Sequence, residues 1–397
     1  MPHQRRRHLE SLLKKTMLFS PITGVFGHRQ VGKTTLVQSL ASCYQSLDLA
    51  ENLAVSESDP MRFLMQNQGY PFGIDECQHS PSLFPAMKEW VRTHRKPGQL
   101  LLSGSVRFTS RKSIRESLTG RIIAWDLLPM DLSEIYHAPL PNRVHLFLSS
   151  KSLDFPLKPA SYATSEALHR YGMSGGMPGI IFLRDPALRE QKFETQLNTI
   201  LERDLKLLLQ TTLNYRSLKL LLSRLAYRIG LPLEFTALSR ETRISVPTIK
   251  KLIDAMESMY LIRVLPTEGS RQKSVVFFED AGEARYVAES FHSPFVPLLN
   301  LLFSNLHPQF RYRPELGIRP YQYRTRGGAT VPLCFRKGDQ NLGVIPLLED
   351  TPGKTEISSA QSFVKTMSKA KVLLVHSSKR DFLVDKNIRA LGISQLL

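Results

Sequence analysis

The sequence predicts an α/β fold: a parallel sheet at the N-terminus, then a helical region with a winged helix, and finally a small second α/β domain. Three observations support this prediction. Short apolar runs alternate with helical patterns up to about residue 140, which is typical of a parallel sheet with crossover helices. A glycine-rich loop follows the first apolar run. Helical periodicity then dominates from residue 162 onward, and strand patterns return in the last hundred residues.

The glycine-rich loop is GHRQVGKTT at residues 27–35, and it satisfies the pattern G-x-x-x-x-G-K-[ST] of phosphate-binding loops (P-loops). A predicted strand at 22–26 precedes it and a predicted helix follows it. This context favours a nucleotide site over a glycine turn without a ligand. The backbone amides of the loop and the helix N-terminus are expected to face the phosphates. The residues predicted to bind the nucleotide are Gly27, His28, Arg29, Gln30, Val31, Gly32, Lys33, Thr34 and Thr35.

Within this loop, Lys33 is expected to reach the β- and γ-phosphates and Thr34 to offer its hydroxyl to Mg²⁺. A second predicted strand, at 72–74, ends in the adjacent acids Asp75 and Glu76. Asp75 is predicted to hold Mg²⁺, and Glu76 to orient and deprotonate the attacking water. A carboxylate beside the metal favours hydrolysis over transfer to another acceptor. Pro71 and Gly73 weaken the strand pattern.

Further catalytic candidates are hydroxyl and arginine side chains. The predicted strand at 100–103 ends in Ser103 and Ser105, either of which could contact the γ-phosphate; a plain strand-to-turn transition is the alternative. Arg107 and Arg121 are candidates to stabilise transition-state charge, in the same chain or across a subunit boundary, and structural ion pairs are the alternative for both. An arginine acting on a neighbouring chain would require an oligomer. Another strand is predicted at 122–127.

Composition describes a folded protein with a strong positive charge. Hydrophobic residues make up 42% and charged residues 22%, and the formal net charge is +18. This charge favours an acidic partner, most simply nucleic acid, although an anionic membrane surface also fits. Cys43, Cys77 and Cys334 are scattered and lack metal-ligand spacing. No apolar run approaches the ~18 residues of a membrane span, so we expect a cytoplasmic protein without zinc or disulfides.

Residues 217–280 have the pattern of a winged helix-turn-helix. Helices are predicted at 218–229 and 235–242, and a third begins at Val246 and Pro247. Strands at 263–265 and 274–278 would form the wing. Contact with DNA and contact with another protein are both open for such a module.

With these motifs in place, the chain resembles prokaryotic AAA-type ATPases that carry a C-terminal domain of unknown function. The matching blocks include GHRQVGKTTL, IDECQHSPSLFPAMK (74–88), GQLLLSGS (98–105), GGMP (175–178), ERD (202–204) and FFEDAG (277–282). The resemblance implies ATP as the nucleotide and gives ATP-site roles to Lys33, Thr34, Asp75 and Glu76. It also implies a C-terminal domain with a restriction-endonuclease-like fold.

The C-terminal part departs from that pattern. Intact relatives carry Glu-x-Asp and Glu-x-Lys on neighbouring strands, where this chain has residues 330–332 (Thr-Val-Pro) and 346–348 (Pro-Leu-Leu). We therefore predict a degenerate, catalytically inactive nuclease fold that lacks metal ligands.

The predicted domains are a P-loop ATPase of the AAA type (1–145), a linker and helical region (146–215), a winged helix-turn-helix (216–285) and the nuclease-like domain (286–397). The predicted function is Mg²⁺-dependent hydrolysis of ATP, coupled to a module that binds nucleic acid or protein. The alternative is a nucleotide-sensing scaffold with negligible turnover.

Overall fold

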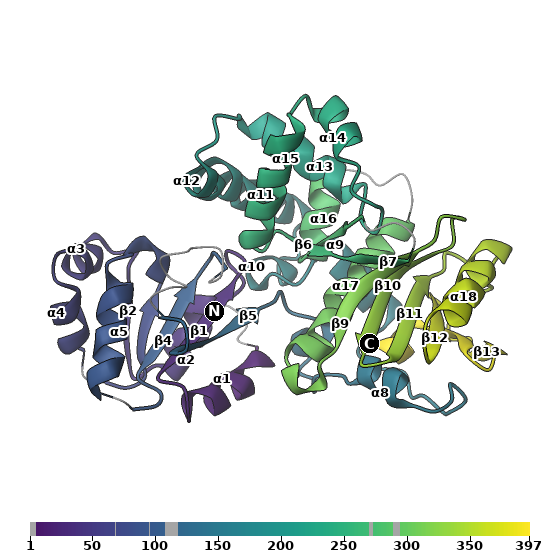
Figure 1. Cartoon of the computed structure of the whole chain (residues 1–397), viewed down its shortest axis with the longest axis horizontal. Helices are drawn as coiled ribbons and strands as arrows, with labels where there is room; N and C mark the ends of the chain where they lie inside the picture. Colours follow the sequence, from purple (N-terminus) through teal and green to yellow (C-terminus); the bar gives the residue numbers. More distant parts are fainter. Residues whose placement is uncertain (1–4, 68, 95, 108–117, 270–272, 289–293) are drawn as a thin grey trace.

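The computed structural model describes residues 5–67, 69–94, 96–107, 118–269, 273–288 and 294–397. Figure 1 shows three units: an N-terminal sheet with its helices, a helical unit above, and a second sheet on the other side. In the described part of the chain, no helix is both long enough and apolar enough to cross a membrane.

The N-terminal unit is built on five parallel strands among the described residues, in the order β2-β3-β4-β1-β5. The strands are β1 (Ile22–Gly27), β2 (Cys43–Ser46), β3 (Phe72–Asp75), β4 (Leu100–Gly104) and β5 (Ile122–Leu127). The predicted strands are confirmed, and β2 was missed. Its sequence, CYQS, is short and only half-buried, so it carries no apolar signal.

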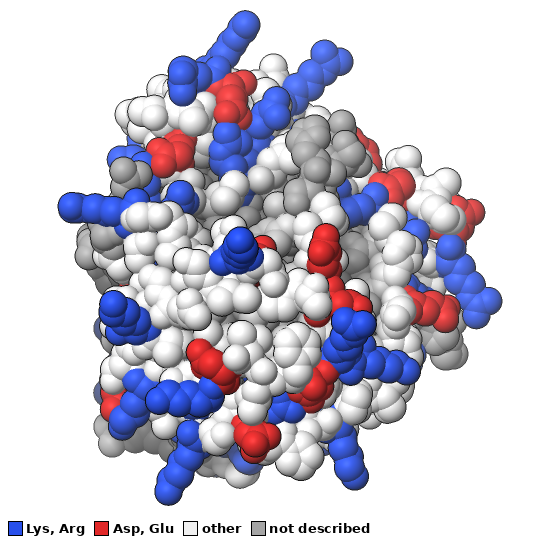
Figure 2. All heavy atoms as spheres, turned by 90° about the vertical axis from the view of Figure 1, so that its right-hand side faces the viewer, with Lys and Arg blue, Asp and Glu red and all other residues white. Residues whose placement is uncertain are grey.

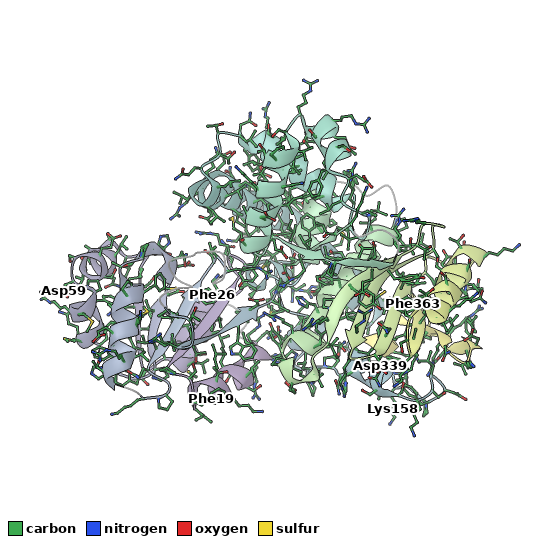
Figure 3. The ribbon with its side chains drawn as sticks, in the orientation of Figure 1. Phe19, Phe26, Asp59, Lys158, Asp339 and Phe363 are labelled. Atoms are coloured by element: carbon green, nitrogen blue, oxygen red, sulfur yellow. The ribbon has the colours of Figure 1, made fainter. Side chains whose placement is uncertain are left out.

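Helices cover both faces of this sheet. The central strands β1 and β4 are buried along their whole length, as parallel strands covered on both faces are, and alternate residues face different layers. Val25 packs with Leu9 of α1 (Leu9–Met17) and with α2 (Lys33–Leu40). Phe26, labelled in Figure 3, packs in the opposite layer with α4 (Pro60–Met65) and α5 (Leu83–His94). Helix α3 (Ala50–Ser58) contacts α4.

The helical unit begins with α9 (Ser165–Ser174), α10 (Pro178–Ile181), α11 (Pro186–Asn198), the π-helical turn η3 (Thr199–Asp204) and α12 (Leu205–Leu209). Three helices follow: α13 (Tyr215–Ala226), α14 (Phe235–Thr242) and α15 (Val246–Ser258). Strands β6 (Ile262–Leu265) and β8 (Val275–Phe278) then form an antiparallel ribbon, before α16 (Ala281–Ala288). The predicted helices and ribbon strands are present, whereas the winged-helix assignment stays a prediction.

The segment between the ribbon strands does not project as a free wing where it is described. Residues of β7 (Thr267–Gly269) pair in parallel with β9 (Arg319–Arg324) and form the edge of the second sheet. Predicted wing residues therefore contribute to the C-terminal unit.

The second sheet has seven strands among the described residues, ordered β13-β14-β12-β11-β10-β9-β7. Its strands are β10 (Thr330–Lys337), β11 (Gln340–Pro346), β12 (Ala370–His376), β13 (Phe382–Asp385) and β14 (Ile388–Gly392), besides β7 and β9. Helix α17 (Phe295–Arg311) packs on one face, and Phe363 of α18 (Lys354–Thr366) packs on the other (Figure 3). Besides α8, which is described below, the remaining elements among the described residues are the short helices α7 (Leu132–Ile135) and α19 (Ile393–Leu396) and the 3-10 turns η1 (Cys77–His79) and η4 (Pro314–Leu316).

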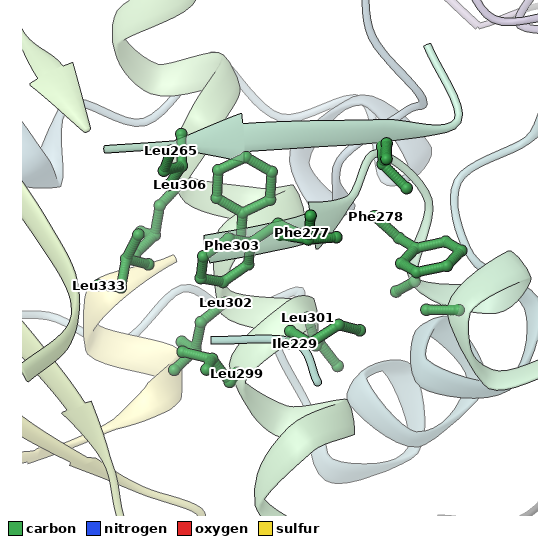
Figure 4. Packing of buried hydrophobic residues seen from close by; sticks show 14 of the residues in the cluster. Ile229, Leu265, Phe277, Phe278, Leu299, Leu301, Leu302, Phe303, Leu306 and Leu333 are labelled. Atoms are coloured by element: carbon green, nitrogen blue, oxygen red, sulfur yellow. The ribbon is translucent and has the colours of Figure 1, made fainter. Parts of the chain in front are cut away.

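Helix α17 joins the helical unit to the second sheet. Figure 4 shows Phe303 of α17 beside Phe277 of β8, with their ring centroids 4.6 Å apart. Leu333 of β10 lies in the same buried cluster. One continuous core therefore spans the domain boundary predicted at residue 286.

The predicted linker also has a structural role. Helix α8 (Arg143–Ser149) contacts β10 and β11, and Lys371 of β12 donates to the carbonyls of Phe147 and Leu148 at 2.7 and 3.1 Å. Residues 143–149 therefore pack with the C-terminal sheet, although the sequence divides them between the first domain and the linker.

Candidate nucleotide-binding site

The glycine-rich loop lies where β1 ends and α2 begins. Gln30 and Gly32 adopt left-handed backbone conformations, with φ of 63° and 101°. A Cβ atom on Gly27 would lie 2.4 Å from the carbonyl oxygen of Leu127, so only glycine fits there. Glycine is therefore required at position 27 by close packing and at position 32 by the left-handed backbone of the turn.

Lys33 is folded against its own loop. Its side chain is 4% exposed, and Nζ donates to the carbonyls of Gly27 at 3.1 Å and His28 at 2.9 Å. Burial lowers the pKa of Lys33, while the Glu76 and Asp75 carboxylates act in the opposite direction. The ammonium therefore lies within electrostatic reach of both acids that follow β3.

Asp75 is buried at the end of β3 and accepts several hydrogen bonds. Thr34 Oγ1 donates to its Oδ2 at 2.6 Å, Tyr44 donates to the same atom at 2.9 Å, and Ser103 donates to Oδ1. Burial, and then the charge of Asp75, raises the pKa of Tyr44, which keeps its hydroxyl a donor. The structure thus brings together β2, β3, β4 and α2.

The oxygens of Thr34 and Asp75 suit Mg²⁺, which is commonly held by one or two protein oxygens and keeps several waters. These two residues would hold the ion. Among the described residues there is no cluster of three or more His, Cys, Asp or Glu side chains that could form an all-protein metal site.

Glu76 follows directly, with a left-handed φ of 53°, a conformation that costs about 1–3 kcal/mol in a residue other than glycine. Its carboxylate accepts a hydrogen bond from Gln78 Nε2, which also donates to Ser105 Oγ at 3.2 Å. Glu76, Gln78 and Ser105 therefore form one hydrogen-bonded row beside Asp75. The two candidate serines therefore differ: Ser105 belongs to this row, and Ser103 donates to Asp75 instead.

A cavity of about 380 Å³ borders the loop at Gly32 and Thr35. It is bounded by the start of α2, by basic residues before α1 and by the helical unit; the lining residues are Arg5, Arg6, Arg7, Glu10, Gly32, Thr35, Leu36, Ser39, Met130 and Pro178.

Side chains outside the motif hold the loop in place. Arg7 donates to the carbonyl of Val31 at 2.7 Å and pairs with Glu134 at 3.0 Å, and its side chain is 7% exposed. Burial raises the pKa of Glu134, and the charge of Arg7 opposes this shift. A basic N-terminus is visible in the sequence, but nothing in it marks Arg7 as the residue that meets the loop.

His28 joins the loop to the helical unit through a fully buried polar cluster. Its Nε2 lies 3.1 Å from Glu283 Oε2 of α16, and Gln196 of α11 donates to Glu283 at 3.0 Å. Burial opposes protonation, but the Glu283 carboxylate raises the pKa of His28. Burial, reinforced by Glu283, raises the pKa of Asp280 to about 6. Asp280 accepts a hydrogen bond from the backbone amide of Gly176 at 2.6 Å. The GGMP and FFEDAG blocks, which are far apart in the chain, are therefore in contact.

Arg29 makes a second connection to the helical unit. Its Nη1 lies 3.1 Å from Oδ2 of Asp204, the last residue of η3, and the two side chains are 29% and 16% exposed. The sequence alone gives the ERD block (202–204) no role, because its position beside the loop depends on tertiary packing.

The two arginine candidates lie elsewhere. Arg107 contacts the Tyr260 ring at 4.5 Å and donates to Glu279 at 3.3 Å and to the carbonyl of Glu257 at 2.8 Å. It forms a structural ion pair, which is the alternative to a catalytic role. Arg121 precedes the residue of β5 that pairs with Ile22, at the opposite end of the sheet from Gly27 and about 20 Å away along the strand. The structure does not bring Arg121 to the phosphate loop of its own chain.

Comparison with known proteins supports the motif assignment. A family profile described as "AAA domain" matches residues 20–136, and one described as "Domain of unknown function (DUF8612)" matches residues 165–282. The second profile covers most of the helical unit and the ribbon, upstream of the place where the sequence suggested a domain of unknown function.

Two uncharacterized proteins, from Mycobacterium bovis and Mycobacterium tuberculosis, are each 24% identical over 286 residues, which is 70% of this chain and 58% of theirs. The chain thus spans less than two thirds of the length of these relatives. A solved structure from Pyrococcus horikoshii, a signal transduction ATPase with numerous domains and a tetratricopeptide repeat sensor, is 14% identical with a TM-score of 0.28; the match covers 78% of this chain and 47% of that one. The chain therefore contains an AAA domain with a P-loop, which implies nucleotide binding, usually with Mg²⁺, followed by a domain of unknown function.

Proposed function

We propose that the protein binds ATP with Mg²⁺ at residues 27–35 and hydrolyses it. The observation that carries the proposal is the convergence of Lys33, Thr34, Asp75 and Glu76 from two elements at one end of a parallel sheet. A P-loop lysine, a hydroxyl, a metal-binding acid and a second acid are the groups that phosphoryl transfer to water requires.

Each side chain has a distinct part in this proposal. Phosphate oxygens compete with the Gly27 and His28 carbonyls for the ammonium protons of Lys33. Thr34 and Asp75 hold Mg²⁺, which neutralises phosphate charge when bound. Glu76 accepts a proton from the attacking water, and Gln78 and Ser105 orient it and the terminal phosphate. The cavity beside Gly32 and Thr35 takes the nucleoside, since Asp75 and Glu76, which are assigned to the terminal phosphate, do not line it.

Steady-state hydrolysis of ATP by wild type and Glu76→Gln tests this function. We expect turnover to fall by about 10²–10⁴-fold in Glu76→Gln, with ATP affinity retained, because only the proton acceptor is removed. Glu57→Gln is the matched control, since Glu57 is an exposed glutamate of α3 in the same domain. Equal turnover in wild type and Glu76→Gln contradicts the role of Glu76.

A nucleotide-sensing scaffold is the second candidate. It is favoured by the buried contact between His28 and Glu283, which ties the phosphate loop to a separate unit. Tight ATP binding by wild type without measurable turnover supports this function instead of hydrolysis.

For the coupled partner we propose DNA, contacted through α15. Lys250 and Lys251 are exposed on this helix, and Ser245 caps its N-terminus through the amide of Thr248 at 3.3 Å. The surface in Figure 2, which faces away from the N-terminal sheet, has basic and acidic side chains interspersed. Lys250 and Lys251 are adjacent on α15 and therefore offer two positive charges to the phosphates of one partner. A protein partner at the same helix would appear as binding without the steep salt dependence of DNA contacts.

We also retain the interpretation of the second sheet as a nuclease-like domain without catalytic activity, because residues 330–332 and 346–348 offer no carboxylates to a metal. A plasmid cleavage assay with Mg²⁺ and Mn²⁺ tests it; cleavage that copurifies with the wild-type chain overturns it.

A further inference from the structure

An ion pair between Arg29 and Asp204 joins the phosphate loop to the helical unit. Arg29 belongs to the phosphate loop and Asp204 to the helical unit, and their charged atoms are 3.1 Å apart. The charges of both residues act on the Lys33 ammonium, along with those of Glu76 and Asp75. Since Arg29 belongs to the same P-loop as Lys33, which reaches the β- and γ-phosphates, the Arg29 guanidinium is a candidate ligand of the terminal phosphate.

The two loop residues that contact the helical unit differ in their freedom to change partners. His28 is fully buried with Glu283 and Gln196, so that contact fixes the loop backbone. Arg29 is 29% exposed, and its pair with Asp204 is partly solvated. Partly exposed ion pairs add little net stability, so a stronger acceptor can replace the carboxylate.

A terminal phosphate is such an acceptor. It presents three oxygens and more negative charge than one carboxylate, and the planar guanidinium binds phosphate oxygens in pairs. A nucleoside diphosphate lacks this group and leaves the pair with Asp204 intact.

We infer that Arg29 and Asp204 form a sensor of the γ-phosphate, in which the Arg29 guanidinium exchanges the Asp204 carboxylate for the terminal phosphate of a bound nucleoside triphosphate. The inference rests on the nucleotide site proposed above and assigns discrimination between triphosphate and diphosphate to this pair.

The position of Asp204 gives the exchange a consequence in the helical unit. Asp204 ends the π-helical turn η3, and such turns occur frequently at functional sites. The chain continues directly into α12, which contacts α15. Breaking the pair with Arg29 therefore changes a contact at the end of η3, next to a helix that packs against the proposed partner-binding helix.

The test measures dissociation constants of the full-length protein for ADP and for the β,γ-imido analogue of ATP, both with Mg²⁺, by calorimetry. The readout is the ratio of the ADP constant to the analogue constant. We expect Arg29→Gln to lower this ratio about tenfold, because the variant cannot make a charge-assisted hydrogen bond to the γ-phosphate. Asp204→Asn is expected to raise it, by about threefold, because Arg29 no longer leaves a charged partner.

Glu202→Gln is the matched control. It removes one negative charge from the same turn and breaks a 2.7 Å pair with Lys206, which does not involve the loop. Its ratio should equal that of wild type. In the double variant Arg29→Gln/Asp204→Asn the ratio should equal that of Arg29→Gln alone, since Asp204 acts through Arg29.

The opposite signs keep the test decisive even where one variant fails to fold. The sensor is overturned by a ratio that is unchanged in Arg29→Gln, or by an Asp204→Asn ratio equal to that of Glu202→Gln. If the wild type still binds nucleotide in that case, the proposed nucleotide site is not overturned. Wild-type protein that binds neither nucleotide overturns both.

Discussion

The hydroxyl of Thr34 donates a 2.6 Å hydrogen bond to the carboxylate of Asp75, which joins the first turn of α2 to the end of β3. The strand between β3 and β1 in the sheet, β4, supplies Ser103 to the other carboxylate oxygen. Both oxygens of the Asp75 carboxylate are therefore held by hydrogen bonds. Oδ2 accepts from Thr34, the residue that follows Lys33 of the phosphate loop.

This relationship predicts the effect of removing the Thr34 hydroxyl. Thr34→Val keeps the shape of the side chain but removes an oxygen that would hold Mg²⁺. We expect it to raise the Mg²⁺ concentration needed for half-maximal ATP hydrolysis and to lower turnover by roughly 10–100-fold, the effect of removing one charge-assisted interaction. Thr34→Ser restores the oxygen and should restore activity. Hydrolysis rates measured across a Mg²⁺ titration check this prediction, and identical Mg²⁺ curves for wild type and Thr34→Val contradict it.

The contact between Gly176 and the AAA domain predicts a stability effect. A Cβ on Gly176 would lie 2.0 Å from the carbonyl oxygen of Met130, a backbone atom that cannot move aside. We expect Gly176→Ala to reduce the free energy of unfolding by about 1–3 kcal/mol through overpacking. Gly179→Ala is the control, because a Cβ there meets nothing within 4 Å. Urea unfolding of both variants measures the difference. Similar stability for both would contradict the prediction and show that the backbone at Met130 can shift to accommodate the methyl group.

Asp280 predicts a pH dependence of stability. Its pKa is raised in the folded protein to about 6, by burial and then by Glu283, against 3.8 for an ordinary aspartate. The folded state therefore binds more protons than the unfolded state between these values, so this carboxyl's contribution to stability is present below pH 4 and is lost as pH rises to about 6. Relative to Asp280→Asn, which does not titrate, wild type should lose on the order of 2–3 kcal/mol across that window. Thermal unfolding from pH 4 to pH 7 checks the sign, and a wild type that gains stability over the variant with rising pH contradicts it.

The proposed DNA contact predicts a change in salt dependence. Replacing Lys250 and Lys251 by Gln should reduce the slope of log affinity against log salt by about 1.8, or ~0.9 for each lysine that no longer neutralises a phosphate. The control replaces Lys354 and Lys365, which are exposed on α18. Fluorescence anisotropy with a double-stranded oligonucleotide measures both slopes. An equal slope change in the two double variants would assign the effect to net charge alone.

Local spacing in the sequence is sufficient to predict the residues at the core of the candidate site. The P-loop pattern needs only consecutive residues, so the positions of Lys33 and Thr34 at the start of a helix follow from Gly27, Gly32 and the apolar run before them. The acids after the second strand are similarly placed, because parallel strands end at a common edge of the sheet. These predictions agree with the geometry around Asp75.

Predictions for single charged residues were weaker. Arg107 and Arg121 both looked available for catalysis, yet Arg107 pairs with Glu279 and Arg121 lies at the far end of β5. An arginine side chain carries the same charge in a structural ion pair and in a catalytic role, so its partner decides between them.

The sequence by itself determined the parallel sheet, the phosphate loop and the acids that face it, because these depend on apolar periodicity and on short spacings along the chain. Only the tertiary structure decided that His28 meets Glu283, that Arg29 meets Asp204 and that β7 joins the second sheet. Each of these contacts pairs residues far apart in the chain, and their positions are set by the burial of a shared core rather than by any local pattern.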